Sequence, residues 1–152
     1  MNGGTLNKTR VLFVCIHNSG RSQIAEAFLN TLGGDTFEAE SAGFEPGTLN
    51  PIVVESLKEV GIDISRNKTK SVFDLYKQGR LYEYVVTVCD ESSAEKCPIF
   101  PGVAKRLHWN FKDPAAFQGS HDGKLAQTHG VRDEIKTKIA DFIKAHTADA
   151  RR

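Results

Sequence analysis

Strand-like and helix-like segments alternate along this sequence, and that order restricts the fold more than any other feature. Residues 11–14 form a continuous apolar run, which predicts a strand covered on both faces. Residues 24–32 carry apolar side chains at helical spacing, and Gly33 and Gly34 can end that helix. Because parallel strands need crossover connections, such an order indicates an α/β fold.

The alternation continues downstream. We expect a strand over 37–41, a helix from Asn50 and Pro51 to Gly61, helical turns over 71–76, a strand over 82–88, an edge strand over 103–109, and a long amphipathic helix carrying Val131, Ile135, Ile139 and Ile143. The sequence therefore predicts a three-layer α/β/α sandwich around a four-stranded parallel sheet. With 152 residues and 39% hydrophobic content, it fits one domain over 1–152, with residues 1–8 as a flexible N-terminus.

Charge and hydropathy disfavour several classes of partner. Twenty basic and nineteen acidic side chains give a net charge of +1, too small to attract nucleic acid or anionic lipid. The longest apolar run, 11–16, is far shorter than the roughly 20 residues that span a bilayer, and no signal-peptide core precedes it. We therefore expect a cytoplasmic protein, a monomer, with no nucleic-acid or membrane partner.

The loop between the first predicted strand and helix joins a thiol to a cation. Cys15 ends the apolar run, and Arg21 follows after five residues. Unpaired amides at a helix N-terminus and the Arg21 guanidinium favour a thiolate, and Ser22 can donate a hydrogen bond to it. Asn18 can organise the loop through its side-chain amide. The same geometry suits a tetrahedral oxyanion, held by the backbone of Ile16, His17, Asn18, Ser19, Gly20 and Arg21.

Further reactive residues follow other predicted strands. Cys89 comes directly after the strand at 82–88, and Asp113 lies in the loop after the edge strand. Because ligands sit beyond the carboxyl ends of parallel strands, we expect Cys15, Cys89 and Asp113 at one edge of the sheet. A third thiol, Cys97, follows eight positions after Cys89. This spacing fits neither a zinc site nor a disulfide framework, so we predict no metal and reactive thiols.

These residues belong to a set of motifs that occur together. They are VLFVCIHNSGRSQIAEAF at 11–28, SAGF at 41–44, GIDIS at 61–65, VVTVCDES at 85–92, HWNFKDPA at 108–115 and VRDEI at 131–135. Over about residues 9–146 the chain resembles the cysteine-dependent, thioredoxin-coupled arsenate reductases. Those enzymes share the low-molecular-weight protein tyrosine phosphatase fold, which the resemblance implies here as well.

The resemblance implies a chemistry for the loop. Cys15 would be the nucleophile that attacks the central atom of a bound oxyanion, and Arg21 would hold the oxyanion with the loop amides. Asp113 would be the general acid for the departing oxygen. Ser22 would support the thiolate and Asn18 the loop.

The resemblance also implies a thiol relay that converts arsenate to arsenite. Cys89 would attack the sulfur of the arseno-cysteine, and Cys97 would then open the Cys15–Cys89 disulfide. No resident cofactor is implied, because an external thiol regenerates the enzyme. Thioredoxin, glutaredoxin and other thiols all stay open as that reductant.

The segment between Cys89 and Cys97 must change shape in such a relay. If it is helical in the reduced protein, a rise of ~1.5 Å per residue separates the two cysteines by about 12 Å. A disulfide needs Cα atoms within about 7 Å. We therefore predict that the segment unwinds or loops out during turnover.

Two other functions remain open. One is a phosphotyrosine phosphatase, in which Cys89 and Cys97 are incidental. Phosphatases of this fold usually place aromatic residues after the acid loop, whereas Asp113 and Pro114 precede Ala115 and Ala116 here, which favours a small inorganic anion. Phe117 weakens that contrast. The other function is an oxyanion-binding or redox-sensing module without turnover.

The resemblance finally raises the question of a cation. Some relatives bind potassium beside the loop through residues that match Asn18, Glu26 and Ser41, together with an aspartate further on. Ser71 stands where we expect that aspartate, so the resemblance does not imply a tight potassium site in this chain.

Overall fold

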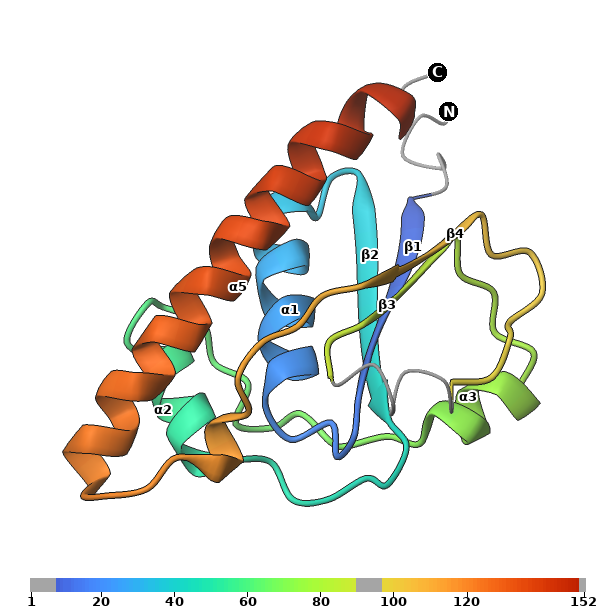
Figure 1. Cartoon of the computed structure of the whole chain (residues 1–152). Helices are drawn as coiled ribbons and strands as arrows, with labels where there is room; N and C mark the ends of the chain where they lie inside the picture. Colours follow the sequence, from blue (N-terminus) through green and yellow to red (C-terminus); the bar gives the residue numbers. More distant parts are fainter. Residues whose placement is uncertain (1–7, 90–96, 151–152) are drawn as a thin grey trace.

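The computed structural model describes residues 8–89 and 97–150, the side chains of 147–150 excepted. The predicted flexible N-terminus, apart from Lys8, lies outside these residues. So does the segment between Cys89 and Cys97, for which we predict a change of shape during turnover. The elements in chain order are β1 (Thr9–Cys15), α1 (Arg21–Gly33), β2 (Phe37–Gly43), α2 (Pro51–Lys58), α3 (Val72–Lys77), β3 (Tyr84–Thr87), β4 (Lys105–His108), η2 (Pro114–Ala116) and α5 (His121–Ala150) (Figure 1).

The predicted four-stranded parallel sheet is confirmed. Its strands lie in the order β2-β1-β3-β4, and every neighbouring pair is parallel. The register pairs Cys15 with Gly43 of β2 and Val14 with Thr87 of β3. The ends of β1, β2 and β3 therefore meet at one edge of the sheet, where the loop after β1 begins, below α1 in Figure 1.

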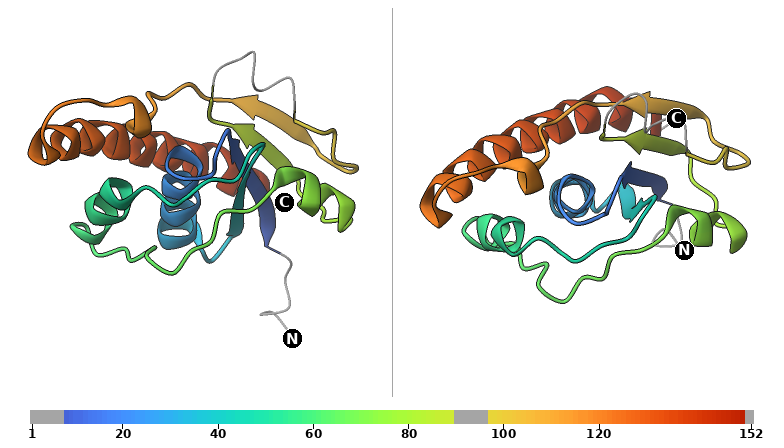
Figure 2. Two further views of the ribbon diagram at one scale, coloured as in Figure 1. Left: turned by 90° about the horizontal axis from the view of Figure 1, so that it is seen from below. Right: turned by 60° about the horizontal axis from the view of Figure 1, so that its bottom comes forward.

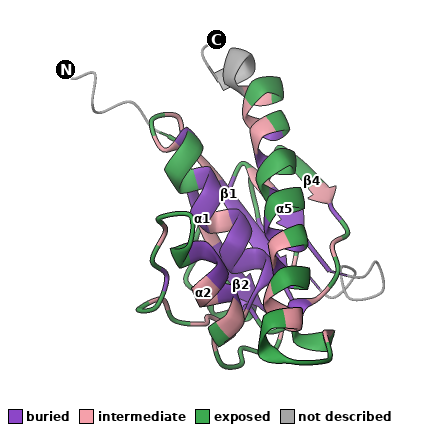
Figure 3. Ribbon diagram, turned by 90° about the vertical axis from the view of Figure 1, so that its left-hand side faces the viewer, coloured by how far each residue is buried: buried purple, intermediate pink, exposed green. Residues whose placement is uncertain are grey.

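Helices cover the sheet on both faces, because side chains alternate along each strand. Val11, Phe13 and Cys15 of β1 belong to a large buried cluster with residues of α1, α2 and α5. Leu12 and Val14 belong to a second cluster with residues of α3. Figure 2 shows α1 beside the sheet with α5 and α2 around it, and Figure 3 shows exposed residues along the outer side of α5. This arrangement is the predicted three-layer sandwich.

Several boundaries differ from the predicted ones. β3 begins at Tyr84 rather than at Tyr82, whose ring packs edge-on against Phe100 and whose hydroxyl donates to Glu40 at 2.9 Å. α5 begins ten positions before Val131, where the Ser120 hydroxyl accepts a hydrogen bond from the Gly123 amide. Among the described residues, no helix is long and apolar enough to cross a membrane.

Candidate active site

Cys15 ends β1 with its sulfur held by two donors. Its side chain is buried, with 3% of the residue exposed. The Asn18 amide donates to Cys15 Sγ at 3.2 Å, and Ser22 Oγ lies 2.9 Å from the same sulfur. The sulfur is therefore anchored between the loop and the first turn of α1.

The direction of the hydrogen bond between Ser22 and Cys15 depends on whether Cys15 is a thiol or a thiolate. Asn18 Nδ2 donates to Ser22 Oγ at 2.8 Å, so that oxygen acts as an acceptor toward Asn18. Either atom of the Ser22–Cys15 pair can donate while Cys15 is a thiol, whereas a Cys15 thiolate can only accept, so in that form the Ser22 hydroxyl donates to Cys15 Sγ. Two hydrogen bonds donated to the sulfur favour its anionic form, which is the nucleophile.

Replacing Ser22 by alanine is expected to slow alkylation of Cys15 by iodoacetamide about tenfold, because a hydrogen bond to a charged group contributes roughly 1.5–3 kcal/mol. The rate is measured in a Cys89→Ser/Cys97→Ser background, where Cys15 is the one remaining thiol. Ser19→Ala is the matched control, since it removes a hydroxyl from the same loop and keeps the backbone amide. Equal rates in both variants would contradict the assigned hydrogen bond.

The carbonyl groups of the loop are all engaged by donors from outside it. The carbonyls of residues 15, 16, 17 and 19 accept from the amides of Phe44, Glu45, Gly47 and Asn50 at 2.8–3.2 Å. The Asn18 carbonyl accepts from Gln23 Nε2 at 3.1 Å, and the Gly20 carbonyl from the Ile24 amide at 2.9 Å. Because these carbonyls point away, the amides between them are turned toward the inside of the loop, where an anion would sit.

Gly43 fixes how close the loop lies to β2. A Cβ atom at this position would lie 2.7 Å from the Ile16 oxygen and 2.8 Å from the Asn18 nitrogen. Both are backbone atoms, which cannot rotate away. The sequence analysis identified the motif SAGF but did not assign this role to Gly43. The glycine in that motif was the one sequence feature that could have indicated a close approach.

Asn18 has a left-handed backbone, with φ of 55°, which asparagine tolerates better than most residues. Its side chain donates to Ser22 and to Ser41 and accepts from the Lys70 amide at 3.0 Å. Gln23 Nε2 also contacts Asn18 Oδ1 at 3.2 Å, and Asn67 donates to Gln23 in turn. The structure thus gives Asn18 the loop-organising position that was predicted, and adds Gln23 and Asn67, which sequence reasoning missed.

Arg21 and Asp113 lie together beside the loop. Arg21 is the first residue of α1 and is buried, and its Nη2 lies 3.4 Å from Asp113 Oδ2. Its Nη1 donates to the Phe111 carbonyl at 3.2 Å. Asp113 also accepts from the Ala115 amide at 2.9 Å, and its side chain is 38% exposed. The guanidinium is thereby positioned by the loop that carries the carboxylate, although Phe111 and Asp113 are about 90 positions away in sequence.

The three cysteines are thiols, and they do not occupy one place. Cys15 and Cys89 belong to the same buried cluster and follow the neighbouring strands β1 and β3. Cys97 belongs to the cluster on the other face of the sheet. Burial raises the pKa of the Cys97 thiol, and the nearby Arg106 partly opposes that rise. Cys97 therefore lies on the opposite face of the sheet from Cys15, where burial disfavours its thiolate form.

No metal cluster accompanies these thiols: within 8–89 and 97–150, no three His, Cys, Asp or Glu side chains are placed to hold a metal ion.

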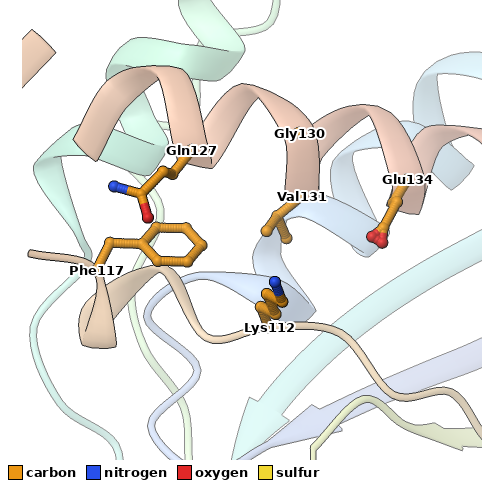
Figure 4. A pocket seen from close by; sticks show the side chains of 6 residues that line it. All are labelled: Lys112, Phe117, Gln127, Gly130, Val131 and Glu134. Atoms are coloured by element: carbon orange, nitrogen blue, oxygen red, sulfur yellow. The ribbon is translucent and has the colours of Figure 1, made fainter. Parts of the chain in front are cut away.

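A cavity of about 440 Å³ lies behind the acid loop, against α5, and contains none of the predicted site residues. Figure 4 shows the Phe117 ring and the Lys112 side chain facing α5 across this space. Phe117 therefore lines a cavity beside α5, while Ala115 and Ala116, which follow Asp113, are exposed. The other residues that line this cavity are Gln127, Gly130, Val131 and Glu134.

Comparison with known proteins gives a family match over nearly the whole chain. The model of the low molecular weight phosphotyrosine protein phosphatases matches residues 10–152. The arsenate reductase of Bacillus subtilis (strain 168) is 43% identical over 132 residues, which is 87% of this chain and 93% of that protein. The arsenate reductase of Shouchella clausii (strain KSM-K16) is 40% identical over 138 residues, covering 90% and 96% of the two chains.

Solved structures give the same fold. An arsenate reductase in a phosphate-binding state superposes with a TM-score of 0.72 at 28% identity, over 90% of this chain and 98% of the other. The thioredoxin-dependent arsenate reductase of Corynebacterium glutamicum superposes with a TM-score of 0.70 at 30% identity. The match covers 96% of this chain and 65% of that chain. A low molecular weight protein tyrosine phosphatase from T. tengcongensis superposes with a TM-score of 0.72 at 25% identity. The match covers 91% of this chain and 99% of that chain. The fold alone therefore does not separate reductases from phosphatases.

Proposed function

Because this chain belongs to the low molecular weight phosphotyrosine protein phosphatase family, with arsenate reductases among its relatives, we propose that it reduces arsenate to arsenite through a relay of three thiols. The comparisons confirm the family that the motifs predicted. One observation favours a reductase over a phosphatase. Cys89, a second buried thiol, follows the strand next to the one that ends at Cys15.

The first step uses the loop and the acid. The inward amides of residues 16–21 and the Arg21 guanidinium bind the oxyanion, and the Cys15 thiolate attacks arsenic. Asp113 gives a proton to the departing oxygen, which leaves as water. The product is an arseno-cysteine in which arsenic is still pentavalent. The Arg21–Asp113 contact of 3.4 Å supports this division of roles, because it places the Asp113 carboxyl group beside the guanidinium that would hold the anion.

The second step transfers two electrons. The Cys89 thiolate attacks Cys15 Sγ, the sulfur–arsenic bond breaks, and its electron pair stays on arsenic, which leaves as arsenite. Cys15 and Cys89 are oxidised to a disulfide. Cys97 then attacks Cys89 Sγ and releases the Cys15 thiolate, leaving a Cys89–Cys97 disulfide for an external dithiol to reduce.

Cys97 must leave its buried position for this exchange. It packs on the opposite face of the sheet from Cys15, and burial favours its protonated form. The attack therefore requires exposure of Cys97, in accord with the predicted rearrangement between the two cysteines. We propose thioredoxin as the reductant and the reducing cytoplasm as the place of the cycle.

Purified protein supplied with arsenate, thioredoxin, thioredoxin reductase and NADPH tests the proposal. We expect arsenate-dependent oxidation of NADPH, lost to the background rate in Cys89→Ser and in Cys97→Ser. Hydrolysis of p-nitrophenyl phosphate is measured in parallel, because the loop can serve both reactions. No arsenate-dependent oxidation, with equal phosphatase activity in all three proteins, would instead assign a phosphatase.

A further inference from the structure

A chain of hydrogen bonds runs from Cys15 to a carboxylate on α1. Asn18 donates one side-chain N–H to Ser22, the donor to Cys15, and the other to Ser41 at 2.9 Å. Ser41 Oγ therefore acts as an acceptor toward Asn18 and donates its proton to Glu26 Oε1 at 2.7 Å. Glu26 is the last acceptor of the chain, so its negative charge orients each hydroxyl and amide before it.

Glu26 needs a positive partner to serve as that acceptor. Burial raises the pKa of its carboxyl group, while the Ser41 hydrogen bond and the charge of Lys70 lower it. The neighbouring carboxylate of Glu40 acts in the unfavourable direction. Glu26 is partly buried, and a carboxylate withdrawn from water in this way is costly without a compensating charge.

Lys70 is fixed at this place by its backbone. Its amide donates to Asn18 Oδ1 at 3.0 Å, and its carbonyl accepts from the Gly43 amide at 2.8 Å. Its side chain lines a cavity of about 140 Å³ together with that of Glu26. The other residues lining this cavity are Gln23, Asn67 and Lys68.

With the Lys70 ammonium in place, the residues around Glu26 do not fit the potassium ion that the family resemblance raised. Asn18 Oδ1 already accepts from Lys70 and Gln23. The Ser71 hydroxyl, at the position expected for an aspartate, accepts from amides in the first turn of α3. The cavity is lined by two lysines and one carboxylate, so its charge repels a further cation.

We infer that Lys70 is a positioning residue whose ammonium is the built-in counterion of Glu26, in the place where the resemblance puts potassium. Through Ser41, Asn18 and Ser22 it keeps donors directed at Cys15 Sγ without any alkali cation. One consequence of the inference, arsenate reduction that does not depend on potassium, rests on the proposed function. The arrangement of Lys70 and Glu26 itself belongs to the folded protein without substrate, and it can be tested without arsenate.

Thermal unfolding in potassium chloride and in choline chloride of equal ionic strength tests the counterion directly. We expect the wild-type midpoint to be the same in both salts. Lys70→Met should lower the midpoint in choline by several degrees, and potassium should restore part of the loss. Lys70→Arg should behave as wild type, because it keeps the charge. Lys68→Met is the matched control at the same cavity, and it should show no potassium response.

The rate at which iodoacetamide alkylates Cys15, in the Cys89→Ser/Cys97→Ser background, measures how the loss of Lys70 affects the hydrogen bonds to the sulfur. We expect Lys70→Met to slow this alkylation about threefold to tenfold in choline, with recovery in potassium. This is less than the outright loss of a hydrogen bond to a charged group, because Lys70 acts on the sulfur only through Glu26, Ser41 and Asn18. Neither readout needs arsenate, so failure of the proposed function would leave both intact. A potassium response in the wild type, or the same response in Lys68→Met and Lys70→Met, would overturn the inference.

Discussion

Replacing Cys15 by serine is expected to abolish arsenate reduction while leaving oxyanion binding in place. The turnover number should fall by on the order of 10⁴-fold or more, as for the loss of other enzymatic nucleophiles. A serine hydroxyl is a far weaker nucleophile than a thiolate and cannot enter a disulfide. The loop amides and Arg21 do not depend on the sulfur, so arsenate should still raise the thermal midpoint.

Steady-state NADPH oxidation and thermal unfolding with added arsenate measure the two effects separately. Arg21→Ala is the complementary variant, since it keeps the nucleophile and removes the cation beside the loop. It should lose the arsenate-induced rise in midpoint. Turnover by Cys15→Ser within tenfold of wild type would exclude Cys15 as the nucleophile.

Gly43→Ala is expected to damage the loop more than any other replacement of hydrogen by methyl near the site. The new Cβ would meet the backbone of three consecutive residues, 16–18, at 2.7–2.9 Å. Relief requires movement of β2 or of the loop, and overpacking of this kind costs about 1–3 kcal/mol. Since 1.4 kcal/mol corresponds to a factor of ten, and the loop holds both sulfur and oxyanion, we expect activity to fall about a hundredfold.

Gly47→Ala provides the matched control on the segment that follows. There a Cβ would approach the Cβ of His17 at 3.4 Å, at the edge of ordinary contact. Its activity and midpoint should stay close to those of wild type. The comparison uses kcat/KM for arsenate and the free energy of unfolding by urea, and equal effects of the two variants would contradict the close approach at Gly43.

The strand and helix order could be predicted because it depends on local patterns. The apolar run before Cys15 and the helical spacing after Arg21 place the loop without knowledge of the rest of the chain. The carboxyl ends of parallel strands share one sheet edge, so Asp113 could be predicted near that loop as well. The structure places it 3.4 Å from Arg21.

The hydrogen-bond chain behind the loop could not be predicted in the same way. Asn18 and Lys70 are 52 positions apart, and Gln23 and Asn67 are 44 apart. Nothing in the local sequence around either residue indicates its partner. Ser71 stands where some relatives have a cation-binding aspartate, and its hydroxyl accepts from amides in the first turn of α3, because helix capping is satisfied within a few residues.

The sequence by itself determined which residues follow which strand, and with them the residues proposed as nucleophile, oxyanion-binding cation and acid, because strand and helix periodicity is encoded within short segments. Only the tertiary structure decided that Gly43 lies against the loop, that Cys97 packs on the face opposite Cys15, and that Lys70 reaches the cavity beside Glu26. The physical reason is that these relations depend on which face of the sheet each side chain occupies and on how distant segments pack, and local periodicity specifies neither.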